Sequence, residues 1–410
     1  MQTFVIVGAS LAGAKAAETL RSEGFDGKIV LLGAESERPY ERPPLSKDYL
    51  RGESERDAAY VHEAGYYEEH DIDLRLGARV TSFDASKNEV SIESGESIGY
   101  DALLLATGAE PRRLPIPGAD LDGVHLLRTM GDSDTLRGVI EGGGRLVVVG
   151  AGWIGCEAAA SARQKGMDVT IVEPMSVPLE RVLGPELGAI YRDVHADHGV
   201  DLRLGGGVEA FEGSGRVERV RTSDGETIDC SAVLVGVGVK PRIELAESAG
   251  LDVGDGVHVD ERLRTSAPNV FAAGDIASHQ HPFYGERVRV EHWGTALEQG
   301  PAAARAMLGS EAPYDRLPYF FSDQYDVGME YAGFAPRFDR VVFRGDTAGR
   351  EFIAFWVDGD RVVAGMNVNV WDVNDAIQAL IRSRARVDDG RLSDPDVPLE
   401  SLAGEEAAAS

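Results

Sequence analysis

Short apolar runs and helix-like segments alternate along the first half of the chain. Residues 4–7 and 29–32 are apolar runs with the length of buried strands, and residues 14–20 between them have helical composition and spacing. The same order returns in residues 145–149, 157–166 and 169–172. Strand, helix and strand in this order predict a parallel sheet covered by helices. We therefore expect two similar α/β units, beginning at residues 3 and 145.

Other segments have the patterns of antiparallel strands, of buried strands or of single helices. Polar and apolar residues alternate in segments 79–84 and 89–93, and segments 208–220 and 226–235 resemble the antiparallel excursion of the same kind of domain. Buried strands that run into small-residue turns are expected in 100–108, 233–238 and 265–275, and helices in 60–70, 295–308 and 375–384. From residue 317 the pattern changes to hairpins, with strands expected at 340–344, 351–357 and 361–366.

The length of the chain predicts several domains. Its 410 residues exceed one ordinary core, and prolines 111, 115 and 117 mark a crossover. The expected division is 1–110 and 240–316 as two segments of one domain, 111–239 as a second and 317–403 as a third, followed by a disordered tail at 404–410. The predicted fold class is α/β, with two dinucleotide-binding domains and a small C-terminal α+β domain.

The first glycine turn has the features of a dinucleotide site. Gly8 permits a tight turn after the strand, and Gly13 lets the helix lie close to it, so that free amides at the helix N-terminus can hold a pyrophosphate. Glu35 follows the second strand, where an acid binds a ribose. Ser10 replaces the middle glycine of the motif, which leaves a plain strand-to-helix turn as the alternative.

The second glycine turn is complete. Gly150, Gly152 and Gly155 follow a buried strand, and Glu173 ends the next one. An acid at this position binds a free 2′-hydroxyl and repels a 2′-phosphate, so the pattern favours NADH over NADPH. Residues 174–180 contain no Lys or Arg, and Arg181 is the one nearby cation that could reverse the preference.

Two further segments carry candidate ligand contacts. Pro43 and Pro44 stiffen a segment that can hold Arg42 and Lys47 at defined positions, although a surface loop with solvated charges is the alternative. Gly-Asp at 274–275 after a buried strand suits a carboxylate that binds a ribityl hydroxyl. Trp293, which precedes a helix, is either a site residue or part of the core.

Composition and charge exclude several functions. With 41 basic and 69 acidic residues the net charge is −28, which argues against nucleic acid or an anionic membrane as partner. The sequence shows no apolar run of membrane-spanning length and no signal sequence, so we expect a cytoplasmic protein. The only cysteines are Cys156 and Cys230, far apart. No metal site is expected, because the His pairs 195/198 and 279/281 lack supporting ligands.

Together these motifs resemble the FAD-dependent NADH:ferredoxin reductase family, which includes putidaredoxin reductase, rubredoxin reductase and the reductases of biphenyl-type dioxygenases. More remotely it includes apoptosis-inducing factor. The resemblance covers nearly the whole chain and rests on Arg42-Pro43-Pro44-Leu45-Ser46-Lys47, Ala106-Thr107-Gly108, Gly150 to Glu157, Gly274-Asp275, Glu291-His292-Trp293 and Ser322-Asp323-Gln324-Tyr325-Asp326. It implies a glutathione-reductase-like flavoprotein with an inserted NAD domain and a C-terminal interface domain.

The resemblance also implies the site residues. FAD would be bound by Gly8, Ser10, Leu11, Ala12, Gly13, Glu35, Arg42, Lys47, Val80, Ala106, Thr107, Gly108, Asp275, Glu291, His292 and Trp293. NADH would be bound by Gly150, Gly152, Trp153, Ile154, Gly155, Glu157, Glu173, Gly236, Val237 and Gly238. The implied catalytic residues are Lys47, which would lie near flavin N5, its ion-pair partner Glu157, and Trp293. Cys156 stands where an apolar residue is expected, and it behaves as a small apolar residue.

Three functions compete on this scaffold. The first is hydride transfer from NADH to FAD, then single electrons to an iron–sulfur ferredoxin that supplies a haem monooxygenase or ring-hydroxylating oxygenase; rubredoxin is the alternative acceptor. A disulfide or peroxide reductase needs a thiolate beside the flavin, and residues 36–60 contain no cysteine. A redox-sensing interaction protein would have basic nucleic-acid surfaces or a targeting segment, which the charge and the N-terminal sequence do not supply.

The ferredoxin is expected to dock on a local basic patch of this acidic chain. The richest cluster is Arg382, Arg384 and Arg386, with Arg391 nearby, and Arg305 lies on the helix after Trp293. Pairing of these arginines with local acids, Asp388 and Asp389 among them, is the alternative. We expect a monomer or a weak homodimer.

Overall fold

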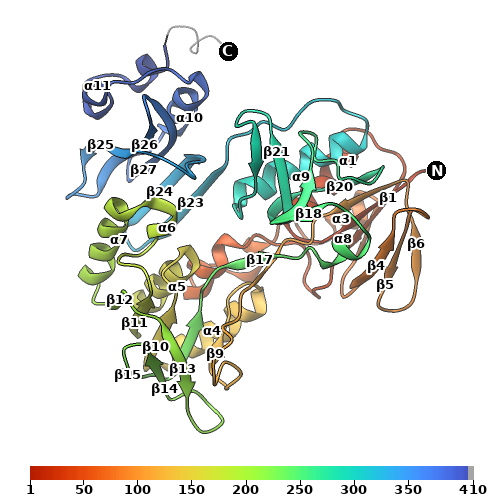
Figure 1. Ribbon diagram of the computed structural model, residues 1–410. Coiled ribbons are helices and arrows are strands. Elements are labelled where there is room, and N and C mark those ends of the chain that lie inside the picture. Colours follow the sequence, from red (N-terminus) through yellow and green to blue (C-terminus); the bar gives the residue numbers. More distant parts are fainter. Residues whose placement is uncertain (405–410) are drawn as a thin grey trace. The chain divides into compact units, whose positions relative to one another are not determined.

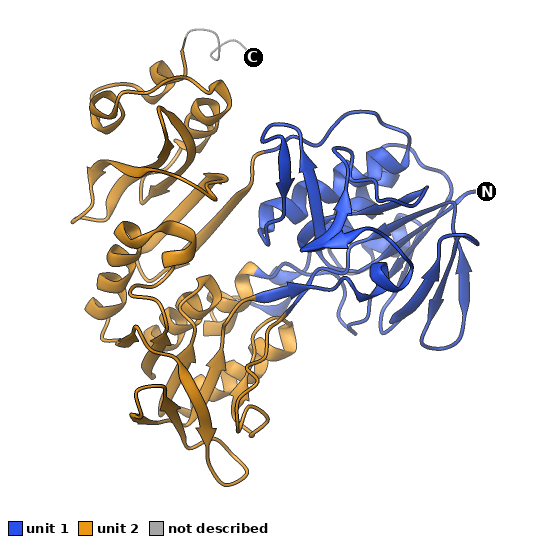
Figure 2. Ribbon diagram, in the orientation of Figure 1, with its two compact units in different colours: residues 1–42, 55–110, 239–316 blue, residues 43–54, 111–238, 317–410 orange. Residues whose placement is uncertain are grey.

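The computed structural model describes residues 1–404 and divides the chain into two compact units (Figures 1 and 2). Unit 1 comprises residues 1–42, 55–110 and 239–316, and unit 2 comprises residues 43–54, 111–238 and 317–410. Each unit therefore draws on distant parts of the sequence. The finer division into four domain segments stays a prediction.

Unit 1 is built on a five-stranded parallel sheet. Its order is β20 (Val270–Ala272), β7 (Ala102–Leu105), β1 (Thr3–Val7), β2 (Lys28–Leu32), β3 (Ile72–Arg75). The central strands are apolar and almost fully buried, as is typical of a parallel sheet covered on both faces. This sheet places the carboxyl ends of β1 and β2 side by side, where the first glycine turn and Glu35 follow.

Helices and smaller sheets complete unit 1. Helix α1 (Leu11–Ser22) packs against α9 (Trp293–Met307), and a Cβ on Gly300 would lie 2.3 Å from the carbonyl oxygen of Ala12, so only glycine permits this approach. The remaining α-helices and strands are α3 (Tyr66–Glu69), β4 (Val80–Asp84), β5 (Glu89–Ile92), β6 (Ser97–Gly99), β8 (Ala109–Pro111), β17 (Val239–Pro241), α8 (Glu244–Ser248), β18 (Val253–Gly254), β19 (Gly256–Val259), β21 (Ala277–His281) and β22 (Glu286–Val288).

Unit 2 contains a second five-stranded parallel sheet. Its order is β12 (Asp201–Leu204), β11 (Asp168–Glu173), β10 (Arg145–Val149), β16 (Ala232–Val235), β9 (Val124–His125). The accompanying elements are α2 (Asp48–Arg51), α4 (Met130–Gly142), α5 (Trp153–Gln164), α6 (Glu180–Leu183), α7 (Pro185–Asp197), β13 (Val208–Glu212), β14 (Arg219–Thr222) and β15 (Thr227–Asp229). The glycine turn at 150–155 again follows the central strand.

A five-stranded antiparallel sheet forms the C-terminal part of unit 2. Its order is β23 (Tyr319–Gln324), β24 (Val327–Gly333), β27 (Arg361–Val368), β26 (Glu351–Asp358), β25 (Arg340–Asp346), with α10 (Asn374–Ser383) and α11 (Asp389–Ser393) packed beside it. One apolar core joins this sheet to the parallel sheet, because Trp356 is fully buried in it and donates its Nε1–H to the Leu183 carbonyl. Helix α5 and strand β23 contact each other.

One predicted helix is wrong over most of its length. Residues 60–70 were expected to be helical, but only Tyr66–Glu69 are. Gly65 has φ +93°, in the left-handed region, and Tyr60 forms an isolated bridge with Tyr40. The other predicted helices are confirmed, although α1 and α5 begin earlier than expected, directly after Ser10 and Gly152. Most predicted strands are also confirmed, but the strand expected in 265–275 is short, Val270–Ala272, and residues 213–218 connect β13 to β14.

Two predicted absences can be compared with the described residues. No helix among residues 1–404 combines the length and apolarity needed to cross a bilayer. In the same part of the chain, no three His, Cys, Asp or Glu side chains come together as metal ligands would. The predicted tail lies outside the described residues except for Gly404.

Candidate functional site: two glycine cradles and a buried ion pair

The first glycine turn, in unit 1, brings backbone segments into a contact that excludes side chains. Gly8 has φ +120°, and a Cβ placed on it would lie 2.1 Å from the carbonyl oxygen of Ala106. A Cβ on Gly13 would lie 2.0 Å from the carbonyl oxygen of Gly8. Ser10 is the N-cap of α1 in an extended conformation, so the amides of the first helical turn lie ahead of it. This is the geometry that cradles a pyrophosphate.

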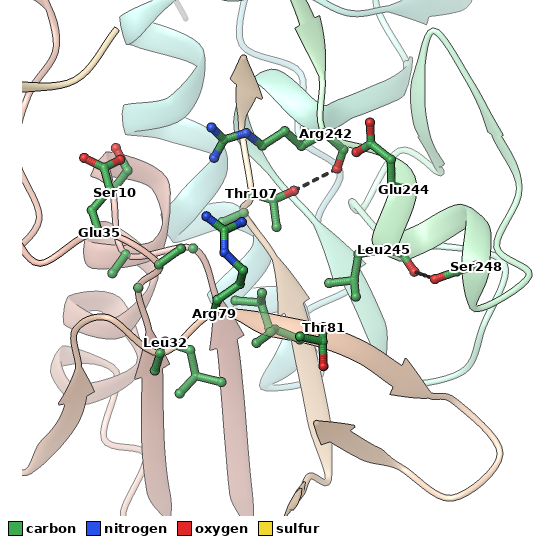
Figure 3. Close-up of a pocket in the computed structure, with 18 of the residues that line it drawn as sticks. Ser10, Leu32, Glu35, Arg79, Thr81, Thr107, Arg242, Glu244, Leu245 and Ser248 are labelled. Carbon is green, nitrogen blue, oxygen red and sulfur yellow. Dashed lines mark hydrogen bonds between the residues drawn. The ribbon is translucent and has the colours of Figure 1, made fainter. Parts of the chain in front are cut away.

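A pocket of about 450 Å³ opens at this turn (Figure 3). Seven predicted FAD residues line it: Gly8, Ser10, Glu35, Arg42, Val80, Ala106 and Thr107. The predicted residues Leu11, Ala12 and Gly13 are buried in α1, and Gly108 accepts a hydrogen bond from the amide of Arg242. The pocket thus joins the first glycine turn to the acid after β2.

Sequence reasoning missed several residues that line this pocket. Among them are Arg79, Thr81, Arg242, Glu244, Leu245 and Ser248. Arg79 and Thr81 lay in a segment identified only as a strand, and the others follow β17, where no motif marks them. Thr107 donates its hydroxyl to the Arg242 carbonyl at 3.1 Å, which holds these segments together (Figure 3). Two added arginines give the pocket cations that suit an anionic ligand.

The Glu35 carboxylate is fixed from two sides. Tyr40 donates its hydroxyl to Oε2 at 2.5 Å, and Arg42 donates Nη2 to Oε1 at 3.3 Å. Burial acts to lower the pKa of Arg42, but the nearby Tyr40, Glu35 and Asp275 raise it above its ordinary value. Glu35 is therefore oriented at the pocket by neighbours from the proline-rich segment that the sequence singled out.

The other predicted FAD residues of unit 1 do not line this pocket. Asp275 lies in a 3₁₀ turn after β20, where Gly274 has φ +80° and donates its amide to Gln299 Oε1 at 2.9 Å. Glu291 accepts a hydrogen bond from Arg289 at 2.6 Å, and His292 and Trp293 begin α9. Burial lowers the pKa of His292 to about 4. Asp275 remains within electrostatic reach of Arg42.

The second glycine turn, in unit 2, repeats the geometry of the first. Gly150 has φ +102°, and a Cβ on it would lie 2.5 Å from the carbonyl oxygen of Gly236. A Cβ on Gly155 would lie 2.1 Å from the carbonyl oxygen of Gly150. Gly152 is exposed, with open space where a Cβ would be, and Ile154 beside it is 42% exposed. The residues present fit a nucleotide pyrophosphate at this helix start.

Several predicted NADH residues surround this turn. Trp153 packs edge-on against Tyr191 and Phe320, and Val237 is half-buried beside the exposed Gly238. Cys156 is buried in α5, and burial raises the pKa of its thiol. It therefore acts as a small apolar residue, as expected.

The predicted Lys47–Glu157 ion pair is present, inside unit 2. Lys47 Nζ lies 2.9 Å from Glu157 Oε2, and the two residues are 7% and 4% exposed. Two hydroxyls also donate to the carboxylate: Ser46 Oγ to Oε2 at 2.5 Å and Ser322 Oγ to Oε1 at 2.6 Å. A buried pair needs such added bonds to offset its desolvation.

Both serines were missed as site residues, although each stands inside a quoted motif. Ser46 directly precedes Lys47, and Ser322 begins the segment 322–326. The loop that carries Lys47 is itself anchored, because Ser133 donates to the Leu45 carbonyl at 2.8 Å and Ser161 to the Ser46 carbonyl at 2.6 Å. Lys47 is thus held by the domain that carries the second glycine turn.

These features define a class of protein. Two parallel sheets, each with a glycine turn at its central strand and an acid after the next, form the scaffold of an oxidoreductase for two dinucleotides. The chain belongs to the pyridine nucleotide-disulphide oxidoreductase family, whose model matches residues 2–300, and residues 319–403 match the model "Reductase C-terminal". The predicted family and fold class are confirmed.

Known relatives match the chain along nearly its whole length. It is 41% identical over 403 residues to the 5,5′-dehydrodivanillate O-demethylase ferredoxin reductase subunit of Sphingobium sp., with 97% of each chain covered. It is 36% identical to putidaredoxin reductase of Pseudomonas putida, with 97% and 96% covered. The structure of a covalent putidaredoxin reductase–putidaredoxin complex matches with a TM-score of 0.95 and 36% identity, over 100% of this chain and 99% of that one.

Proposed function

We propose that this chain is an FAD-dependent NADH:ferredoxin oxidoreductase, the reductase component of an oxygenase system. When bound, FAD accepts a hydride from NADH and releases electrons singly to an iron–sulfur protein. The observation that carries the proposal is the buried Lys47–Glu157 pair beside a complete NAD-type glycine turn, in a family whose similar members include ferredoxin reductases. The chain's own residues supply binding, orientation and charge.

In unit 1, FAD is assigned to the glycine turn and its pocket. The amides after Ser10 bind the pyrophosphate, and Glu35 binds the adenosine ribose. Asp275 binds a ribityl hydroxyl, and Arg42 lies along the flavin. The domain concerned comprises residues 1–110 and 240–316. The close backbone contacts at Gly8 and Gly13 support this assignment, since neither position has room for a Cβ.

In unit 2, NADH is assigned to the turn at Gly150–Gly155, within the domain 111–239. Glu173 selects the free 2′-hydroxyl, and Glu157 with Lys47 orients the nicotinamide end. Electron transfer through a protein thiol is disfavoured, because burial raises the thiol pKa of Cys156, and that of Cys230 to about 11. A thiol needs the opposite shift to act as a nucleophile.

The ferredoxin is assigned to the arginines at the end of α10. Arg382, Arg384 and Arg386 are exposed, and Arg386 lies 3.1 Å from Asp360. Arg305, in unit 1, is exposed and pairs with Glu23 at 2.9 Å. The alternative, in which Asp388 and Asp389 pair with these arginines, is disfavoured because both acids have other partners. Asp388 caps α11, and Asp389 pairs with Arg340. A monomeric or weakly dimeric cytoplasmic enzyme completes the proposal.

The test is anaerobic mixing of the purified holoprotein with NADH, followed by an excess of candidate ferredoxins. We expect rapid bleaching of the flavin absorbance and reduction of one ferredoxin at many turnovers per minute. Slow turnover with a long-lived flavin–NAD charge-transfer complex would instead indicate a redox sensor. Rubredoxin, in place of the ferredoxin, tests the alternative acceptor.

A further inference from the structure

A chain of buried side chains continues from Glu157 away from Lys47. Ser322 Oγ, which contacts Glu157, lies 3.3 Å from Gln324 Nε2, and Gln324 Oε1 lies 3.0 Å from His195 Nε2. The other imidazole nitrogen of His195, Nδ1, lies 3.3 Å from the hydroxyl of Tyr325. Ser322, Gln324 and His195 are each at most 1% exposed. No assignment made above uses Gln324, His195 or Tyr325.

The donor and the acceptor of every hydrogen bond in this chain of side chains can be assigned by starting from Glu157. An ionised Glu157 only accepts, so Ser322 donates to it and must accept from Gln324 Nε2. Gln324 Oε1 only accepts, so His195 carries its proton on Nε2. His195 Nδ1 is then an acceptor, and Tyr325 donates to it. The chain therefore requires one amide orientation and one imidazole tautomer.

The fold holds this chain between two elements. Ser322 and Gln324 are two residues apart on β23 and face the same side, while Asp323 between them is exposed. His195 is on α7, fully buried, and burial lowers its pKa to about 4, so it is neutral near pH 7. Buried polar chains of this kind rigidify the groups at their ends when every member has its partner.

We propose that Ser322, Gln324 and His195 are positioning residues that orient the Glu157 carboxylate towards Lys47, and through it the nicotinamide end of NADH. The expected effect on flavin reduction by NADH rests on the proposed function. The hydrogen-bonded chain and its orientation of Glu157 do not. The Glu157 oxygens are distinguished by their partners: Oε1 takes Ser322, and Oε2 takes Lys47 and Ser46. Loss of the outer chain frees Ser322 to rotate and the carboxylate to turn with it.

The first test is spectroscopic and needs no turnover. In the ¹⁵N-histidine-labelled holoprotein, long-range ¹H–¹⁵N spectra should show His195 as the neutral Nε2–H tautomer between pH 6 and 8. The signal is assigned by its absence in His195→Gln. A protonated His195, or the Nδ1–H tautomer, would overturn the proposed chain.

The second test separates positioning from packing. His195→Leu removes the donor to Gln324, and His195→Gln can restore an N–H near the same place. Val194→Ala is the matched control, since it removes buried volume from the same turn of α7 without touching a hydrogen bond. The limiting rate of flavin reduction by NADH should fall about tenfold in His195→Leu, because displacements well below 1 Å matter at a reacting centre. The rate should stay within about twofold of wild type in His195→Gln and Val194→Ala.

The outcomes are distinguishable. The NADH dissociation constant should change little in all three variants, because the glycine turn and Glu173 dominate binding. Equal rates in His195→Leu and Val194→Ala, at matched melting temperatures, would overturn the positioning role. Absence of flavin reduction in the wild-type protein would reject the proposed function instead, and the tautomer measurement would still decide whether the chain exists.

Discussion

The backbone amide of Ala151 donates a hydrogen bond to Glu173 Oε2 at 2.6 Å. The acid at the end of β11 therefore holds the glycine turn that follows β10. Its second oxygen, Oε1, accepts from the amide of Met175 at 3.0 Å. The residue that the sequence motif assigns to coenzyme choice thus also shapes the turn on which the coenzyme would lie.

This double role gives a prediction for coenzyme preference. Wild-type protein should use NADH with a kcat/KM at least about tenfold above that for NADPH, because Glu173 repels a 2′-phosphate. Glu173→Gln removes the charge but keeps an acceptor for the Ala151 amide. It should therefore reduce the preference for NADH, mainly by raising kcat/KM for NADPH. Glu173→Ala should also lower kcat/KM for NADH. Equal wild-type efficiencies would show that Arg181 or another cation compensates.

A pair of helical glycines tests the first cradle. Gly13→Ala places a Cβ 2.0 Å from the Gly8 carbonyl oxygen, so α1 must move away from β1 and FAD retention should be lost. Gly138, in α4, has open space at its Cβ position and helical φ. Gly138→Ala should therefore stabilise the protein by up to about 1 kcal/mol. The stoichiometry of bound flavin tests Gly13→Ala, and the melting temperature tests Gly138→Ala. FAD retained at full stoichiometry in Gly13→Ala would contradict the assignment of FAD to the first glycine turn.

The glycine turns could be predicted from the sequence because they depend on local geometry. Gly8 and Gly150 need positive φ, and the buried strands on either side are continuous apolar runs. The Lys47–Glu157 pair came from the family resemblance, since its two residues are far apart in the chain. Ser46 and Ser322 were missed because a serine in a loop or strand has no pattern that marks a buried acceptor nearby.

The arginines of the first pocket show a second limit of the sequence. Arg79 begins a segment whose alternation predicts only a strand, and Arg242 follows β17, where no motif marks it. A helix was wrongly expected at 60–65 because Gly65 was not recognised as a helix start. Such errors arise where tertiary contacts, rather than periodicity, decide the backbone. His195 and Gln324 belong to the same class, since their pairing joins α7 to β23.

The buried ion pair gives a prediction for stability and for rate. Lys47→Met leaves the Glu157 carboxylate buried without its cation and should cost about 3 kcal/mol of unfolding free energy. The double variant Lys47→Met/Glu157→Gln removes both charges and should recover most of this loss. Glu157→Ala should slow flavin reduction by NADH while FAD stays bound. Denaturant unfolding and stopped-flow absorbance check these outcomes, and an unchanged hydride-transfer rate would reject the assigned role of Glu157.

Two buried imidazoles give a prediction for acid stability. Burial lowers the pKa of His195 and of His279 to about 4, from an unfolded value of 6.5. Because the folded pKa is the lower one, the stability that each contributes is complete above pH 6.5 and is lost as pH falls towards 4. Between pH 7.5 and 5, the free energy of unfolding should therefore fall by about 2 kcal/mol less in His279→Leu than in the wild-type protein. A loss in His279→Leu that runs parallel to that of wild type would contradict the buried neutral imidazole.

The last prediction concerns where an acidic ferredoxin, as the family resemblance implies, meets a chain of net charge −28. The overall fields repel, so encounter must depend on a local basic surface. Arg382, Arg384 and Arg386 are exposed at the end of α10, where Arg384 has φ +51° and ends the helix. Reversing all three to Glu should slow ferredoxin reduction and flatten its salt dependence, because exposed charges act mainly on the association rate.

A control variant with the same change in net charge separates the effect of where the charges lie from the effect of total charge. Arg192, Arg203 and Arg219 are 43–47% exposed in their side chains, and their reversal to Glu changes the net charge by the same amount elsewhere in unit 2. We expect near wild-type ferredoxin reduction in this control, and near wild-type reduction of a small quinone in both triple variants. Trp293, predicted to be a catalytic residue, is unchanged in each. If the two triple variants lose ferredoxin reduction equally, the effect is one of total charge, and the arginines after α10 are not the dock.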